Sequence, residues 1–511
     1  GKDMAAIITS KFRLDSTNKF VESLSDNQFY MALGRPNAWT DDSVPDTPYE
    51  NDYASHTLWE NMFAMKRVDA GDIVHSAPRY LWVSGTTYIE YDDQDTNIES
   101  KKYFVISANN NVYMCLKAGA GASTTNPDDT GVQTSGVINH SGSDGYIWKY
   151  MYTVPTADVT KFLTSSFIPV RRIAEAPAGG SDTALTNQWS VQGNAVDGAI
   201  YNMKITNAGT GYTSAPTITI SGNGSSATAT ATVSGGAITG ITMTNVGTGY
   251  RHATVTITGG SGSNGAVRPV IGPIGGFGAD PTNDLRAHYV TVNTVFTGDE
   301  SGTIPDSNDF RQIAVVKNPI EKANETAVIS ATGSMVVGNF YKILTKGNTT
   351  DANFATAGST SGNPVVGEIF KAIATTITGS STGTIAQVAE ASAYNTCKSV
   401  TIPASLASTY VADFAFEGHT SGTVGAKGIV VEYNNTSGVL HYIQNETTGF
   451  GTFTTSHLTR ATGSSGAGNQ ISAVAAPLIN HHQGDVMFIE NRTATTRGTG
   501  QVETIRLVIA F

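Results

Sequence analysis

Apolar and polar residues alternate with a period of two along much of the chain, and this alternation predicts β-strands. Every second side chain of a strand lies on the same face of a sheet, so such stretches are expected to be half-buried. They are rich in Val, Ile, Tyr and Thr, which favour extended backbone. In the N-terminal part the candidate strands are FYMALG from Phe29, RYLWVSG from Arg79, TTYIEY from Thr86, YFVIS from Tyr103, VYMCLKA from Val112 and YIWKYMYTV from Tyr146.

Two N-terminal segments have the apolar spacing of helices instead. They are residues 14–25 and 53–68. In the second segment Leu58, Met62 and Met65 recur at i, i+4 and i+7, which would place them on one face of a helix. We therefore expect a few short helices among the strands.

One pattern occurs twice: residues 207–222, NAGTGYTSAPTITISG, return at 245–260 as NVGTGYRHATVTITGG, 38 positions further on. A Gly-rich loop binds phosphate where it leads into a helix, whose N-terminal N–H groups then face the anion. Here each loop leads into TITI or TVTI, which are strand patterns, and the G-x-G-x-x-G match at 260–265 precedes prolines that disfavour a helix. The repeat therefore predicts two copies of a β unit, with Gly and Asn at the turns and with Tyr212 and Tyr250 covering a small core.

Shifts in composition divide the chain into a body that is interrupted twice. The body is rich in aromatic residues, whereas the two interruptions are rich in Gly, Ser and Thr. In the second interruption residues 334–347 and 367–379 and the turn 435–438 predict hairpins, and 481–511 contains two further strand patterns. We expect a mainly β fold: a multi-domain, β-sandwich-like body with a few short helices and two inserted small β modules. The expected segments are body 4–180, repeat module 188–280, body 284–325, inserted module 328–478 and body 480–511.

Composition and charge narrow the classes of partner. The 54 glycines and the charged fraction of 14% favour short strands and turns. The formal net charge of −11, without a clustered basic face, argues against nucleic acid as a partner. No apolar run reaches the roughly 18 residues of a membrane helix and the first residues lack the order of a secretory signal, so we expect no membrane contact. Cys115 and Cys397 are far apart, which argues against a disulfide framework and a cysteine metal site.

Two loop patterns could carry chemistry, and each has a simpler interpretation. Residues 379–383 match the G-x-S-x-G of a nucleophile elbow, which requires a following helix, and a hairpin turn accounts for them better. Asp93, Asp95, Asn97 and Glu99 could supply oxygen ligands to calcium. The run lacks the Gly and Glu positions of an EF-hand loop, so we interpret it as a solvated acidic turn.

Two further candidates involve histidine and carboxylate groups. His481 and His482 are adjacent, so on a strand they would point to opposite faces and could not chelate one metal together; we expect surface residues. Asp144, close to Tyr146 and Trp148, is a carboxylate to test for glycoside hydrolysis, although a Gly-Asp turn entering an aromatic strand explains the same residues. We therefore assign no catalytic, cofactor-binding or metal-binding residue.

Six fragments, collinear along the chain, resemble one family. They are AIITSKFR (6–13), MALGRPNAW (31–39), DGYIWKYMYTVP (144–155), FRQIAVVKNP (310–319), GDVMFIENR (484–492) and ETIRLVIAF (503–511). The family is that of baseplate wedge proteins of T-even-like contractile-tailed bacteriophages, and the fragments resemble its β-rich subunit, which forms a homodimer at the baseplate periphery. The resemblance covers about half of the chain and does not extend to the inserted modules. The residues that carry it, called the motif residues below, are Ser10, Lys11, Phe12, Arg13, Gly34, Arg35, Asp144, Gly145, Tyr146, Trp148, Phe310, Arg311, Gln312, Asn318, Pro319, Glu490, Asn491 and Arg492.

The resemblance implies a non-enzymatic structural subunit without a cofactor. In that family the subunit joins neighbouring wedge proteins, and the assembled baseplate changes shape when the tail contracts. The implied location is the tail baseplate of the virion, with assembly in the host cytoplasm. The implied partners are a second copy of the chain and other wedge proteins, with no nucleic acid and no membrane. We expect the inserted modules to project outward as decoration or as additional docking surface.

Two other hypotheses stay open. A receptor-binding adhesin or tail-fibre protein would explain the Gly/Thr-rich repeats, although fibres usually form trimers and repeat along most of the chain. A carbohydrate-active enzyme with β accessory modules would need a pocket with perturbed carboxylates, for which Asp144 and Glu490 are the residues to mutate.

Overall fold

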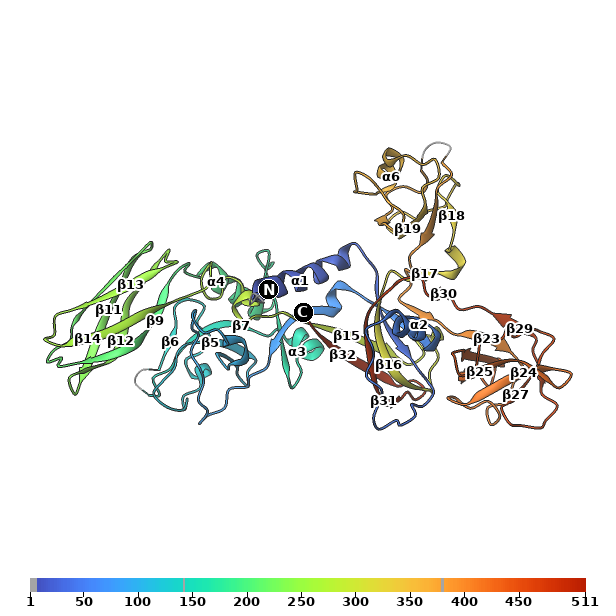
Figure 1. Ribbon diagram of the computed structural model, residues 1–511, viewed down its shortest axis with the longest axis horizontal. Coiled ribbons are helices and arrows are strands. Elements are labelled where there is room, and N and C mark those ends of the chain that lie inside the picture. Colours follow the sequence, from blue (N-terminus) through green and yellow to red (C-terminus); the bar gives the residue numbers. More distant parts are fainter. Residues whose placement is uncertain (1–6, 141–142, 378–380) are drawn as a thin grey trace, which may run out of the picture. The chain divides into compact units, whose positions relative to one another are not determined.

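The computed structural model describes residues 7–140, 143–377 and 381–511. It is mainly β, as the sequence predicts, with 39% of residues in strands and 14% in helices (Figure 1). The helices are α1 (Ser10–Glu22), α2 (Asp52–Asn61), α3 (Thr156–Phe162), α4 (Thr183–Gly193), α5 (Pro281–Asp284) and α6 (Asp351–Ala357). Short 3-10 helices lie at Ser23–Ser25, Ala70–Asp72, Ile98–Ser100, Pro127–Thr130 and Lys322–Asn324.

Contacts between residues divide the chain into two compact units. The first unit comprises the residues up to 19 together with 74–292 and 507–511, and the second comprises 20–73 and 293–506. The chain crosses from one unit to the other within α1, β3 (Ile73–Pro78), β15 (Tyr289–Thr297) and β32 (Val502–Ala510). The segment boundaries that we expect from composition do not coincide with these units and remain a prediction.

The first unit is built around an aromatic core. One sheet has the order β4–β5–β7–β6, and β3 pairs with β8 in another. Tyr146 stacks on Trp148 with ring centroids 5.5 Å apart, and Val191 of α4 belongs to the same buried cluster. Helix α4 therefore covers aromatic residues of β7. The bounds of these strands are β4 (Phe104–Ile106), β5 (Asn111–Lys117), β6 (Ile138–Asn139), β7 (Ile147–Thr153) and β8 (Phe167–Val170).

The sequence repeat forms six antiparallel strands with two-fold pseudosymmetry, three from each copy. They are β9 (Ile200–Thr210), β10 (Thr217–Gly222), β11 (Ser225–Ser234), β12 (Ala237–Thr248), β13 (Ala253–Thr258) and β14 (Ser263–Ile271). The first strand of each copy pairs with the third strand of the other, β9 with β14 and β12 with β11, and the two middle strands pair with each other. Equivalent residues have equivalent partners: Thr210 is opposite Ser263, and Thr248 is opposite Ser225. The two copies therefore exchange strands around one common core.

The Gly-Thr-Gly-Tyr turns have the structural role that the sequence predicts. Gly209 and Gly247 have a φ of 66°, and the N–H of each donates to the side chain of the Asn two residues earlier (3.0 and 2.9 Å). Tyr212 and Tyr250 are buried in the core of the module. Each turn leads into a strand, β10 or β13, which is not the geometry of a phosphate-binding loop.

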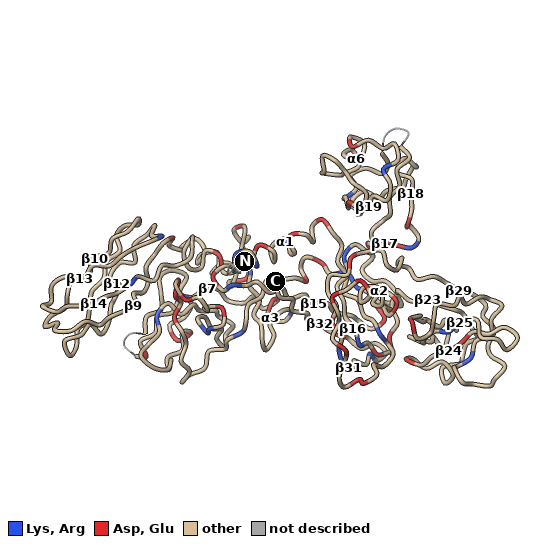
Figure 2. Tube along the Cα trace, in the orientation of Figure 1, with Lys and Arg blue, Asp and Glu red and all other residues tan. Residues whose placement is uncertain are grey.

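The six strands carry two charged residues, Lys204 and Arg268. In Figure 2 the repeat module is accordingly drawn almost entirely in the tan of uncharged residues. The Nζ atom of Lys204 lies 3.2 Å from the carboxylate of Glu90 and 2.8 Å from that of Asp92, and Arg268 lies 2.6 Å from Asp92. The Nζ atom of Lys117, in β5, donates to the carbonyl of Ile241 (3.0 Å). The charged side chains of β9 and β14 thus anchor the repeat module to the rest of the first unit.

The second unit contains a five-stranded sheet of order β22–β2–β1–β16–β31. Its strands are β1 (Phe29–Gly34), β2 (Met62–Val68), β16 (Asp309–Lys317), β22 (Ala393–Asn395) and β31 (Asp485–Thr496). Most residues of β1 and β16 are buried, because the strands lie inside the sheet. A two-stranded ladder, β17 (Ile320–Glu321) with β30 (Ile479–Asn480), accompanies it.

Two further sheets of this unit come from residues 327–475. The smaller has the order β18–β21–β19–β20 and packs with α6 around a core of its own, whereas the larger has seven strands in the order β28–β27–β24–β25–β26–β23–β29. The hairpin predicted at 435–438 is present as β25 and β26. Within the predicted ranges 334–347 and 367–379 the strands are the shorter β19 and β20, which pair with each other, and residues 378 and 379 lie outside the described residues. The strands are β18 (Ala327–Val328), β19 (Phe340–Thr345), β20 (Ile369–Lys371), β21 (Thr384–Gln387), β23 (Lys398–Thr401), β24 (Ala415–Thr420), β25 (Thr423–Tyr433), β26 (Val439–Ile443), β27 (Leu458–Ala461), β28 (Asn469–Gln470) and β29 (Ala473–Ala475).

The secondary-structure predictions were wrong in three places. The predicted helix 53–68 ends at Asn61, and β2 follows; Met62 and Met65 are buried inside the sheet, where burial on both faces erases the alternation of a strand. The segments from Arg79 and Thr86 are irregular and make only isolated bridges. Helices α3 to α6 were not predicted, because each is short and its apolar spacing is weak.

Candidate functional site

Motif residues from three distant parts of the sequence meet at one end of the five-stranded sheet. Gly34 of β1 is opposite Gln312 of β16, which is in turn opposite Asn491 of β31. Gln312 donates from Nε2 to Asn491 Oδ1 (2.8 Å), and Asn491 donates from Nδ2 to the carbonyl of Asp46 (2.8 Å). Side-chain amides therefore connect two strands to the loop that follows β1.

Arg311 is the buried charge at this end of the sheet. Its side chain is 6% exposed, and it donates from Nε and Nη2 to the carboxylate of Asp42 (3.0 and 2.9 Å). It also donates to Asp309 (3.1 Å) and to the carbonyl of Pro36. The hydrogen bond from Arg311 lowers the pKa of Asp42, so this carboxylate is ionised at neutral pH. Arg311 thereby fastens the loop after β1 to β16.

Two arginines of the motif lie over aromatic rings. Arg35, whose φ is 55°, places its guanidinium carbon 3.7 Å from the ring centroid of Trp39. The guanidinium of Arg492 lies 5.8 Å from the ring centroid of Phe310. Trp39 donates from Nε1 to the carbonyl of Arg492 (3.0 Å), which joins the two stacks. These contacts orient the loop and leave each guanidinium in contact with an aromatic face.

A cavity of about 270 Å³ adjoins these residues. Arg35, Gln312 and Asn491 line it, together with Tyr49 and Tyr53, whose side chains are largely exposed. Gln312 Oε1 and Arg35 Nε are buried and have no protein partner among the described residues. The cavity therefore combines exposed aromatic surface with amide and guanidinium groups.

The other motif residues of the second unit have structural contacts. Asn318 has a φ of 50°, accepts at Oδ1 from the N–H of Gln28 (2.9 Å) and donates to the side chain of Asn27 (2.7 Å). The carbonyl of Pro319 accepts from the N–H of Ala389 (2.8 Å). Glu490 lies in β31 opposite Ile313 of β16.

The motif residues of the first unit lie in α1 and at the start of β7. Ser10, Lys11 and Phe12 form the first turn of α1, and Arg13 makes an ion pair with Glu99. Ala6, the first residue of the first fragment, lies outside the described residues. This group therefore belongs to a different unit from Gly34, Gln312 and Asn491.

Asp144 has the environment of a structural turn. Its carboxylate accepts hydrogen bonds from the N–H groups of Thr124 (2.9 Å), Thr125 (3.0 Å) and Tyr146 (3.1 Å), and Gly145 has a φ of 81°. Burial alone would raise its pKa, but these backbone N–H donors outweigh burial and lower it. A general acid for glycoside hydrolysis needs a raised pKa, so this geometry favours the turn.

The acidic run 93–99 is neutralised by cations of the protein itself. The pairs are Asp93 with Arg268, Asp95 with Lys101 and Glu99 with Arg13. Among the described residues no group of three or more His, Cys, Asp or Glu side chains is placed to hold a metal ion. These ion pairs support the interpretation of residues 93–99 as an acidic turn rather than as a calcium site.

The G-x-S-x-G match does not have the context of a nucleophile elbow. Gly379 and the following Ser lie outside the described residues. Ser381 Oγ accepts only a long hydrogen bond from Asn353 Nδ2 (3.4 Å), and Gly383 leads into β21 rather than into a helix. The strand after the motif supports the turn interpretation.

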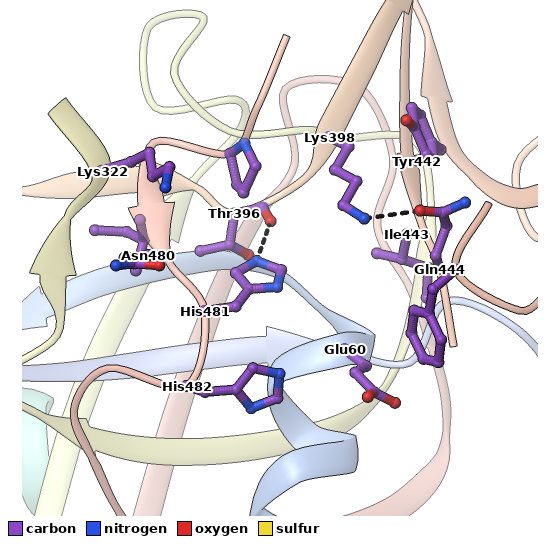
Figure 3. A pocket seen from close by; sticks show the side chains of 13 residues that line it. Glu60, Lys322, Thr396, Lys398, Tyr442, Ile443, Gln444, Asn480, His481 and His482 are labelled. Atoms are coloured by element: carbon purple, nitrogen blue, oxygen red, sulfur yellow. Dashed lines mark hydrogen bonds between the residues drawn. The ribbon is translucent and has the colours of Figure 1, made fainter. Parts of the chain in front are cut away.

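The histidine pair lies in a turn between β30 and β31 rather than on a strand; of the two expected surface residues, His482 is exposed and His481 is half-buried. The rings of His481 and His482 both contact Trp59, at centroid distances of 6.2 and 6.5 Å, and both residues line a cavity of about 360 Å³ (Figure 3). His481 donates from Nε2 to the carbonyl of Thr396 (2.9 Å). Burial lowers the pKa of His481 to about 4, so this ring is neutral at physiological pH.

Glu60 and Lys398 complete this cavity (Figure 3). Glu60 comes from α2, and burial raises its pKa. Lys398 begins β23 and donates from Nζ to Gln444 Oε1 (2.7 Å), and burial lowers its pKa. The sequence does not signal this group of residues, because Glu60 lies hundreds of positions before the others and the members follow no spacing rule.

The sequence matches no protein-family model and is not significantly similar to any curated protein. Among the described residues no helix is both long enough and apolar enough to cross a membrane.

Proposed function

We propose that this chain is a structural subunit of the baseplate wedge of a contractile-tailed phage. It would join neighbouring wedge proteins and take part in the rearrangement of the baseplate on contraction. The observation that carries the proposal is the meeting of three resembling fragments, 31–39, 310–319 and 484–492, on the adjacent strands β1, β16 and β31. Fragments so far apart in sequence are expected to be neighbours when they belong to one shared body. Chance matches have no reason to meet.

The surface beside these fragments supports a role in assembly. Val44, Tyr49 and Tyr53 are 70%, 75% and 56% exposed and lie on the loop and helix that follow β1. Aromatic residues are enriched at the centres of protein interfaces, because a ring buries a large area at little entropic cost.

The first test is the mass of the purified chain in solution, measured by light scattering coupled to size exclusion. The proposal expects the mass of two chains, since the resembled subunit is a homodimer and a two-fold interface uses one surface twice. A stable trimer would contradict it and would favour the adhesin hypothesis.

The second test is assembly with the other wedge proteins of the same phage. We expect the purified chain to elute with them as one complex. The variant Tyr49→Ser with Tyr53→Ser should weaken that complex, whereas Phe414→Ser, which removes another exposed ring, serves as a control for the loss of an aromatic side chain. A complex that forms equally well in both variants would place the contact elsewhere.

A further inference from the structure

The cavity of Glu60, Lys398 and His481 is built from several parts of the second unit. Its walls come from α2, from Thr396 and Lys398 at the start of β23, from residues 442–444 at the end of β26, from residues 477–482, and from the single residues Lys322 and Phe450. Figure 3 shows Lys398, His481 and Glu60 around the same space. A volume of about 360 Å³ lies within the range of small-ligand sites, which is about 300–1,000 Å³.

The charges of this cavity balance but are not paired with each other. Among the described residues neither Glu60 nor Lys398 has an ion-pair partner within 4.0 Å. Lys322, the other cation in the lining, is 2.8 Å from Glu325 and is neutralised there. The cavity therefore has one unpaired cation and one unpaired anion, which disfavours phosphate groups and other strong anions.

The polar groups are held in fixed positions. Gln444 donates from Nε2 to the carbonyls of Lys427 (2.8 Å) and Gly451 (2.7 Å), so its Oε1 is oriented to receive Lys398. The ammonium of Lys398 has three hydrogens, of which Gln444 takes one. Because His481 donates from Nε2, its Nδ1 is an acceptor in the neutral ring. Lys398 therefore offers a hydrogen-bond donor to the cavity, and His481 offers an acceptor.

An apolar surface completes the lining. The ring of Phe450 is 55% exposed, and Tyr442 and Pro477 are also part of the wall. Contact of a large aromatic ring with water is unfavourable, and exposed rings are common at sites that bind a molecule with one apolar face. A mixture of donors, acceptors and an exposed ring, without net charge, matches a molecule that has hydroxyl groups at its edges and C–H groups on its face.

We propose that this cavity binds a neutral saccharide unit. Lys398 donates to one sugar hydroxyl, Glu60 and Nδ1 of His481 accept from others, and the C–H face of the ring lies on Phe450. This proposal goes beyond the structural role in a wedge and does not depend on it. It would give the subunit a point of contact with a glycan.

The test uses the full chain and a panel of neutral sugars. Glucose, galactose, N-acetylglucosamine, maltose, lactose and chitobiose are titrated at millimolar concentration, and binding is followed by saturation-transfer NMR and calorimetry. We expect at least one of them to bind, and we expect Glu60→Gln and Lys398→Met to weaken it about tenfold or more, because each removes a charge-assisted hydrogen bond. Phe450→Ala should weaken binding without altering any charge.

Matched controls carry the same chemical changes outside the cavity. Glu50→Gln and Lys342→Met should bind as the unchanged protein does. Glu60→Gln is expected to fold with unchanged or higher thermal stability, since it removes an unpaired, half-buried charge. Lys398→Met also removes the donor to the buried Oε1 of Gln444, so we expect a small loss of thermal stability without loss of the fold. Solution mass and wedge assembly should be unaffected in them, so failure of this proposal can be told apart from failure of the proposed function.

Three results would overturn the proposal. One is that no sugar of the panel binds. Another is binding that survives Glu60→Gln, Lys398→Met and Phe450→Ala, which would place the sugar elsewhere. The third is binding of glucuronic acid or of free amino acids without any binding of neutral sugars, which would assign the cavity to an anion or a zwitterion.

Discussion

Asp284 is a carboxyl group in the interior of the first unit. It is 3% exposed, and its Oδ2 accepts from the N–H of Gly278 (2.7 Å). Burial raises its pKa to about 8, with Asp280 adding to the shift and Lys149 opposing it. At neutral pH this group is therefore largely protonated. Arg311 is the opposite case, since it is a buried charge whose carboxylate partners keep it ionised and satisfied.

We predict that Asp284→Asn removes a pH dependence of stability. A carboxyl group with a raised folded-state pKa stabilises fully below its unfolded pKa, and this contribution is lost as pH rises towards about 8. The unchanged protein should thus lose up to about 1.4 kcal/mol per pH unit between pH 4 and 8 through this group. In Asp284→Asn, which keeps an acceptor for Gly278, the decline should be shallower. Thermal melts across this range test it, and parallel curves for the two proteins would refute it.

We predict that Arg311→Lys is as damaging as Arg311→Met. Lysine cannot reproduce the two parallel hydrogen bonds to Asp42 together with those to Asp309 and the Pro36 carbonyl. The expected loss of stability is about 1–3 kcal/mol, with faster amide hydrogen exchange in residues 36–49. Lys322→Met, which breaks an exposed ion pair, is the control and should be nearly silent. Full rescue by lysine would contradict the bidentate role.

At the scale of elements, the repeat module shows how a short sequence unit makes a stable sheet. The three strands of one copy would leave an apolar face uncovered. The second copy covers this face, because β14 of the second copy pairs with β9 of the first and β11 of the first pairs with β12 of the second. The exposed face of β10, β11 and β13 is lined by Thr and Ser, whose side chains suit a strand without adding an apolar surface. Because of this symmetry, the same substitution at equivalent positions of the two copies should change the stability of the module by the same amount.

We predict that Gly209→Ala and Gly247→Ala cost the same. A Cβ at Gly209 would lie 2.6 Å from the carbonyl oxygen of Ser263, and at Gly247 it would lie 2.7 Å from that of Ser225, while both residues have a φ of 66°. Each change should destabilise the module by about 1–3 kcal/mol. Gly240→Ala, with nothing nearer than 3.9 Å, should be neutral. Hydrogen exchange across β9–β14 measures all three, and unequal effects of the first two would argue against the symmetry.

At the scale of the whole molecule, neither unit is a continuous piece of sequence. The chain passes between them within α1, β3, β15 and β32, so domains cannot be separated by a single cut. The repeat module, in contrast, is one continuous segment, and its first and last strands, β9 and β14, are paired with each other. Ile205 is opposite Val267 in that pair, which brings the two ends of the module together.

We predict that residues 206–266 can be replaced by a short Gly-Ser linker without loss of assembly. The linker would join Ile205 to Val267, which paired strands hold about 5 Å apart. Lys204 and Arg268 remain and keep their contacts with Asp92. The shortened chain should form a particle with the same number of chains and should enter the same wedge complex as the full chain. Loss of the complex would show that the module is itself a contact surface.

Much of the fold followed from local pattern. The strands at Phe29, Val112 and Tyr146, the repeat and its turns, and the hairpin at 435–438 were predicted because alternation and turn residues act over a few neighbours. The part of α1 from Leu14 to Glu22 was predicted for the same reason, whereas its first turn was not. Among the candidate sites, the sequence favoured a turn over a catalytic carboxylate at Asp144, whose carboxylate accepts backbone hydrogen bonds. It also favoured a turn over a calcium site at residues 93–99, where Asp95 forms an ion pair with Lys101.

Only the tertiary structure decided the rest. Met62 and Met65 lie in a strand because neighbouring strands bury both of their faces, which local spacing cannot signal. The meeting of Gly34, Gln312 and Asn491 depends on strand order, and the cavity of Glu60, Lys398 and His481 depends on how loops and helix α2 close around it. The sequence by itself determined the class of structure, because backbone preference and turn chemistry are local. The sites were decided by long-range pairing, because distant residues acquire a common environment only when the chain has folded.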